Sequence, residues 1–97
     1  MDPAAGHVAL PRGWWSEGVH RRDVLLRALT GEDEAFLLGD AAGLLPAERT
    51  SALLGRCVTA LDGGEPVTPE RIDALSVGDR EALLLSVRQL TLGDRMQ

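Results

Sequence analysis

The segment from Ser76 to Gly93 constrains the fold most, because its pattern is that of one long amphipathic helix. Ser76 is suited to cap the first turn, and Gly93 is suited to end the last one. At about 100° per residue, the apolar side chains gather on one stripe, formed by Leu83, Leu84, Val87 and Leu90. We therefore expect this helix to bury one face against the rest of the chain.

Two residues of this helix depart from the pattern. Leu85 points almost opposite the apolar stripe, whereas Arg80 projects close to it, where a lone cation needs a carboxylate or a route to solvent. One interpretation is that Leu85 is a scattered surface leucine and that the Arg80 side chain extends to water. The other is that Leu85 contacts a partner protein and that Arg80 pairs with an acid such as Asp33 or Asp94.

Three shorter helices are expected upstream, each with a start signal. Thr30 is placed to cap the first one, with Asp33 at the third helical position. Pro46 opens the second helix, where a missing N–H costs nothing, and Thr68 followed by Pro69 opens the third. These expected helices cover residues 31–39, 46–61 and 69–75.

The first 18 residues have the pattern of an arm or a loose hairpin. They are rich in Gly, Pro and Ala, and Pro11-Arg12-Gly13 has turn chemistry. The β-branched and apolar residues of Val19–Arg27 favour a strand that pairs back onto His7–Leu10. We expect a mainly α fold: a small domain of three to four helices over residues 19–97, with an N-terminal β-hairpin or extended arm over residues 1–18.

Composition narrows the class of protein. Ninety-seven residues allow one domain with a small core, and with one Phe and no Tyr that core must consist of Leu, Val and Ala. The net charge is −5, and the ten basic residues are Arg dispersed along the chain, so nucleic acid is not an expected partner. No apolar run suits a signal peptide or a membrane span. A single cysteine allows no intramolecular disulfide, and we expect a cytoplasmic protein.

No residue pattern indicates catalysis, a cofactor or a metal. The acids of Glu32–Glu34 occupy a first helical turn, where the helix dipole explains them. Cys57 lies on an apolar helix face without a His at nucleophile spacing, which is typical of a buried, inert thiol. His7 and His20 have no Cys or carboxylate pattern around them that suggests zinc. We therefore expect no enzyme activity, no cofactor and no metal site.

Trp14 and Trp15 are candidate recognition residues. Large aromatic rings on an irregular segment give contact area at low entropy cost and are typical interface anchors. The other interpretation is that one or both cover the small core. Because adjacent residues of an extended segment point to opposite sides, one domain can hardly bury both.

Several motifs in a fixed order carry a family resemblance over roughly residues 19–95. They are Leu29-Thr30-Gly31-Glu32-Asp33-Glu34, Leu53-Leu54-Gly55-Arg56-Cys57, Asp62-Gly63-Gly64, and the two tripeptides Gly78-Asp79-Arg80 and Gly93-Asp94-Arg95. In this order they resemble the baseplate proteins, often called baseplate hub assembly chaperones, of T-even-type phages and of related contractile tails and injection systems. Members of that family often continue into a Cys-containing, zinc-ribbon-like tail, whereas this sequence stops at Met96-Gln97.

The resemblance implies a non-enzymatic protein that helps assemble the baseplate or hub of a contractile tail. Its partners would be baseplate, hub or spike subunits in a hetero-oligomer, and it could reside within an assembled tail-like particle. The expected contact residues are Trp14, Trp15, Asp79, Arg80, Leu85, Asp94 and Arg95. The alternative hypothesis is a cytosolic adaptor or regulatory domain that binds an effector or enzyme outside any particle.

Overall fold

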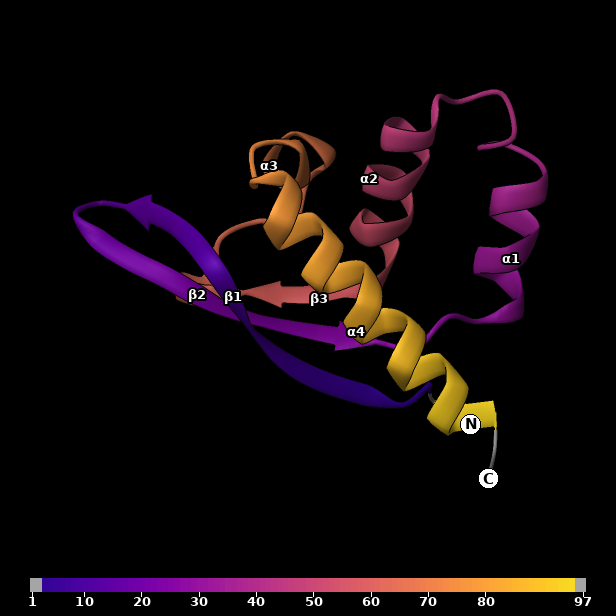
Figure 1. Ribbon diagram of the computed structural model, residues 1–97, viewed down its shortest axis with the longest axis horizontal. Coiled ribbons are helices and arrows are strands. Elements are labelled where there is room, and N and C mark those ends of the chain that lie inside the picture. The colour runs from indigo at the N-terminus through magenta and orange to yellow at the C-terminus, as the bar shows by residue number, and fades with distance from the viewer. Residues whose placement is uncertain (1–2, 96–97) are drawn as a thin grey trace.

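The centre of the molecule is a three-stranded antiparallel sheet in the order β1-β2-β3 (Figure 1). The structure is a computed structural model that describes residues 3–95, so Met96-Gln97 lies outside the described residues. The strands span Ala5–Ser16 (β1), Val19–Arg27 (β2) and Val58–Leu61 (β3). Residues 5–16, expected to lie in an arm, thus form the longest strand of the sheet.

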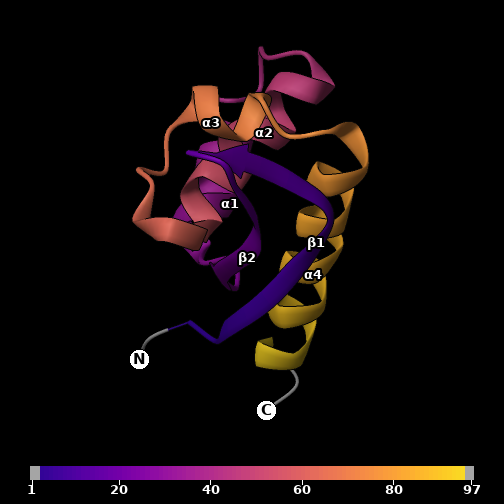
Figure 2. The ribbon, with the colours of Figure 1, turned by 90° about the vertical axis from the view of Figure 1, so that its left-hand side faces the viewer.

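Helices cover one face and one end of this sheet. Their bounds are Gly31–Leu38 (α1), Pro46–Cys57 (α2), Pro69–Asp73 (α3) and Val77–Arg95 (α4), with a 3₁₀ turn at Asp62–Gly64 (η1). Helix α4 lies on the face turned to the viewer in Figure 1, and Figure 2 shows it running alongside β1. A Cβ atom on Gly6 would lie 2.8 Å from Leu90 Cδ1, so α4 packs directly against the β1 backbone.

The expectation of a mainly α fold is wrong. The molecule is a small α/β fold, in which the sheet forms a full layer under the helices and is not an appended hairpin. The strands contain 12, 9 and 4 residues, and β1 and β2 supply buried core residues. The error lies at two places, the length of the N-terminal hairpin and the end of α2.

The N-terminal hairpin is longer than expected because Pro11-Arg12-Gly13 does not form its turn. The β1–β2 register shifts between Ala9 and Trp14, so this tripeptide lies in a bulge within β1. The turn lies at Glu17-Gly18, where both residues have positive φ angles of 50° and 78°, as a two-residue type I′ turn requires. The expected pairing of Val19–Arg27 with His7–Leu10 is confirmed in its main part, since Val8 pairs with Val24.

The segment expected as one helix over residues 46–61 changes structure after Cys57. Val58–Leu61 forms β3, whose Leu61 and Ala60 pair with Val24 and Leu25 of β2. Val58 and Leu61 are spaced to continue the apolar face of α2, but they are equally suited to a short buried strand. Pairing with residues of β2 that lie 32 to 37 positions upstream decided between the two structures.

The helix start signals are confirmed. The Thr30 side chain accepts a hydrogen bond from the Asp33 amide, and the Asp33 carboxylate accepts one from the Thr30 amide. The Thr68 hydroxyl accepts from the Arg71 amide, and Ser76 Oγ accepts from the amide three residues later. The predicted ends were less accurate, because α4 continues through Gly93 to Arg95.

The core lies between the inner face of the sheet and the helices. Its fully buried large side chains come from β1, β2, α2, α3 and α4: Leu10, Val24, Leu26, Leu54, Ile72, Leu83 and Val87. The opposite face of the sheet exposes His7, Ala9, Asp23 and Leu25 to solvent. The sheet therefore buries one face only, as is common in antiparallel sheets.

Candidate protein-binding surface

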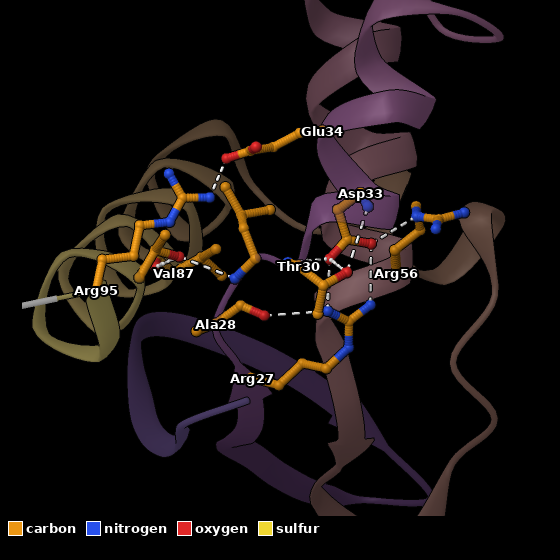
Figure 3. Close-up of polar contacts among 10 residues, drawn as sticks. Arg27, Ala28, Thr30, Asp33, Glu34, Arg56, Val87 and Arg95 are labelled. Atoms are coloured by element: carbon orange, nitrogen blue, oxygen red, sulfur yellow. Dashed lines mark hydrogen bonds and ion pairs between the residues drawn. The ribbon is translucent and has the colours of Figure 1, made fainter. Parts of the chain in front are cut away.

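Asp33 is a fully buried carboxylate that joins three elements (Figure 3). Arg27, at the end of β2, donates to its two oxygens at 2.6 and 3.1 Å, and Arg56 of α2 donates at 2.8 Å. The amide of Thr30 adds a third donor at 2.8 Å. Hydrogen bonds from Arg27 hold the pKa of Asp33 well below its ordinary range, against the effect of burial. Because both of its oxygens already accept hydrogen bonds, this carboxylate is suited to stabilising the fold and not to transferring protons.

Asp79 is the second fully buried carboxylate, and it anchors the bulge of β1. Its two oxygens accept hydrogen bonds from the amides of Arg12 at 2.9 Å and Gly13 at 2.8 Å. Gly13 has a φ angle of 72°, and a Cβ atom there would lie 2.2 Å from the Arg21 carbonyl oxygen. The first Gly-Asp-Arg tripeptide thus contributes its acid to the interior of the molecule.

The arginine of the same tripeptide has a different partner from the one expected. Arg80 Nη1 lies 3.8 Å from a carboxylate oxygen of Asp73 and 3.4 Å from Ser51 Oγ. The expected pairing with Asp33 or Asp94 is wrong, since Asp33 is held by Arg27 and Arg56. In sequence Asp73 is the nearest acid before Asp79, seven residues before Arg80.

The second Gly-Asp-Arg tripeptide lies at the other end of α4. Arg95 forms an ion pair with Glu34 of α1, drawn in Figure 3. Asp94 lines a hollow of about 390 Å³ between the start of β1 and the end of α4, together with His7 and Gln89. The two tripeptides are therefore separated by the length of the helix and do not form one site.

Trp15, at the tip of the β1–β2 hairpin, is the most prominent exposed aromatic residue. Its side chain is 73% exposed. It pairs across the hairpin with His20, and the two rings stack with centroids 5.0 Å apart. His20 Nε2 lies 2.7 Å from the Arg12 carbonyl oxygen, to which it donates. The tight turn and this stack hold the exposed indole in one orientation.

Trp14 points to the opposite side and ties the hairpin to the segment before α3. It is 9% exposed, and its Nε1 donates to Glu65 Oε2 at 3.1 Å. The Arg71 guanidinium lies 5.0 Å from the centroid of the Trp14 ring and 2.6 Å from the Glu65 carboxylate. Hydrogen bonds from Ser16 and Trp14, with the nearby Arg71 charge, lower the pKa of Glu65. The hairpin tip is thus fixed to the domain beneath it.

A hollow of about 270 Å³ lies beside Trp15. It is lined by Trp15, Ser16, Glu65, Pro66, Thr68 and Arg71. We name these residues, together with His20, the hairpin-tip surface. An exposed indole next to a hollow that offers one cation and one anion is typical of a protein-binding anchor site. Sequence reasoning found Trp15 but missed His20, Glu65 and Arg71, which are brought in by pairing across the hairpin and by α3.

Leu85 is one of several exposed apolar side chains on the outer face of α4. It is 56% exposed, Leu92 is 63% exposed, and Val77 at the start of the helix is similar. Sequence reasoning singled out Leu85 but not Leu92, although the spacing of seven residues places both on the same face. Arg88 lies between Leu85 and Leu92, Glu81 precedes Leu85, and both charged side chains are also exposed.

Cys57 offers a direct test of core packing. Burial raises the pKa of its thiol to about 11. We expect the folded protein not to react with a thiol reagent such as Ellman's reagent at about pH 8, because thiolate is the reacting form. The same protein in urea should react to one equivalent. Reaction in the folded state at the rate of a free thiol would contradict the buried position.

Among residues 3–95, no group of three or more His, Cys, Asp or Glu side chains is placed to hold a metal ion. No helix in this part of the chain is both long and apolar enough to span a lipid bilayer.

Comparison of the chain with protein-family models, with curated proteins and with solved structures finds no match. The hairpin-tip surface therefore has to be interpreted from its own geometry, together with the motif order of the sequence.

Proposed function

We propose that the protein is a non-enzymatic binding subunit that docks a partner protein through the hairpin-tip surface. The observation that carries this proposal is the exposed indole of Trp15, held by the stacked His20 ring beside the hollow. Burying an indole removes a large apolar area from water, and little side-chain entropy is lost because the ring is already fixed. Trp is also the residue most often found to dominate binding energy at protein interfaces.

The hairpin-tip surface also favours a partner with mixed polar and apolar character. Arg71 lies 2.6 Å from Glu65, and both residues line the hollow. A partner that inserts an apolar side chain beside Trp15 and an acceptor group toward Arg71 would satisfy both features.

The setting that we propose is the baseplate or hub of a contractile tail or tail-like injection particle. The support for this setting is the order of motifs in the sequence, from Leu29–Glu34 to the second Gly-Asp-Arg tripeptide at residues 93–95. In that setting the partner is a baseplate, hub or spike subunit. The alternative setting is a free adaptor complex, and the experiment below separates the two.

Replacing Trp15 with Glu is expected to weaken partner capture at least tenfold, because the anchor is lost and a charge enters the interface. The matched control is Leu38→Glu, which introduces the same charge at an 83% exposed side chain on α1. Tagged wild-type and variant proteins are expressed in the native cells, lysates are fractionated on a density gradient, and co-migrating proteins are identified by mass spectrometry.

The gradient gives distinct outcomes. Co-migration of the wild type and the Leu38 variant with sheath, tube or spike proteins, and its loss in the Trp15 variant, would support the whole proposal. A Trp15-dependent light complex without tail proteins would support docking but overturn the baseplate setting. Capture that is equal in all three proteins would overturn the hairpin-tip surface as the docking site. Circular dichroism should show that both variants fold.

A further inference from the structure

The outer face of α4 carries an ordered pattern of apolar and charged side chains that the hairpin-tip surface does not use. The exposed residues along it are Val77, Glu81, Leu85, Arg88 and Leu92. At about 100° per residue, all five fall within a stripe roughly 80° wide. Figures 1 and 2 show α4 as the outermost element on its side of the molecule, so a second helix has access to this stripe.

The two charges of the stripe have no partners within the described part of the chain. Neither Glu81 nor Arg88 belongs to an ion pair there. They are seven residues apart on one helix, or about 10 Å along its axis, which is too far for them to pair with each other.

We propose that α4 pairs antiparallel with α4 of a second copy of this chain. A two-fold axis midway between residues 84 and 85 places Glu81 opposite Arg88 of the other copy, and Arg88 opposite its Glu81. The same axis places Val77 opposite Leu92 and brings the two Leu85 side chains next to each other. A contact of this kind is isologous, with one surface used twice, which is the commonest arrangement of protein dimers.

Charge favours the antiparallel orientation over the parallel one. A parallel pairing would set Glu81 against Glu81 and Arg88 against Arg88, so repulsion would oppose it. The antiparallel pairing satisfies both charges at once and matches apolar residues at both ends of the stripe. Because each copy carries a net charge of −5, the overall repulsion between two copies opposes association. The two Glu81–Arg88 pairs must therefore supply the specificity. The pairing does not depend on the proposed docking through the hairpin tip.

Sedimentation velocity over a range of concentrations tests the pairing. The wild type should shift from monomer to dimer in about the micromolar range that small interfaces reach. Glu81→Arg and Arg88→Glu should each weaken dimerisation about tenfold, since two symmetric attractions become repulsions. The double variant carrying both changes should recover the wild-type constant. The control Glu70→Arg makes the same charge change at an exposed residue of α3 and should have no effect.

Crosslinking tests the register on its own. Leu85→Cys treated with a short bismaleimide should give a covalent dimer, whereas Val77→Cys should not, because the two Val77 positions lie far from the axis on opposite sides. Cys57 is buried and does not compete. A wild type that stays monomeric at the highest concentration, a double variant that does not recover, or equal crosslinking at both positions would overturn the proposal.

Discussion

Replacing Asp33 with Asn is expected to lower the free energy of unfolding by about 3 kcal/mol. Asn keeps the size of the side chain but removes the charge that faces Arg27 and Arg56. Both arginines are partly buried, so each would keep a charge without its counter-ion. Leaving two partly buried charges without a counter-ion destabilises a protein far more than losing an ion pair at the surface.

The same substitution is expected to change the response to acid. Because the pKa of Asp33 is lowered in the folded state, its contribution is fully present above the ordinary Asp pKa of about 4. That contribution is lost as the pH falls from there toward the folded-state pKa. Urea denaturation followed by circular dichroism between neutral and acidic pH should show a smaller acid loss in Asp33→Asn than in the wild type.

The control for both measurements is Glu32→Gln, which removes a carboxylate from the adjacent, exposed position of α1. We expect it to change the free energy of unfolding by less than about 1 kcal/mol, the size of a helix-dipole effect. If Asp33→Asn were no more destabilising than this control at neutral pH, the buried cluster would not be holding the three elements together.

Replacing Asp79 with Ala should lower the free energy of unfolding by about 2 to 3 kcal/mol, because two amides of the bulge lose the carboxylate that accepts their hydrogen bonds. Arg12 and Gly13 donate to its oxygens at 2.9 and 2.8 Å. Hydrogen exchange by mass spectrometry or NMR should show faster exchange at these two amides than elsewhere in β1, since the bulge would loosen before the paired regions.

A matched control exists six residues upstream. Asp73→Ala removes a carboxylate that is 62% exposed and lies 3.8 Å from Arg80, so its effect should stay within about 1 kcal/mol. Unchanged exchange at the Arg12 and Gly13 amides in the Asp79 variant would show that water or other groups satisfy them, and the anchoring role would be withdrawn.

Local signals in the sequence predicted the elements they govern. Residues close together in the sequence determine these elements. They are the strand Val19–Arg27, the Thr30 cap, and the helix starts at Pro46 and Pro69. Such signals depend on side-chain and backbone chemistry that neighbours determine, so one sequence is enough to identify them.

The fold class was predicted wrongly because contacts between residues far apart in the sequence determine it. Gly13 is suited to a turn or to a bulge, and its contact with Asp79 selects the bulge. Val58–Leu61 is suited to a helix or a strand, and pairing with β2 selects the strand. The candidate site shows the same limit: Trp15 was predicted from its chemistry, but His20 and Arg71 join it only through the hairpin register and the position of α3.

The packing of α4 on β1 has a consequence for how the chain folds as it leaves the ribosome. Strand β1 is made well before α4, the helix that packs on its inner face. The acceptor for its bulge amides comes 66 and 67 residues later. Until then the inner face of β1 lacks the helix that packs against it, and exposed apolar surface is the condition in which nascent chains aggregate or recruit holding factors. Folding of the described domain is thus completed only after α4 has left the ribosome.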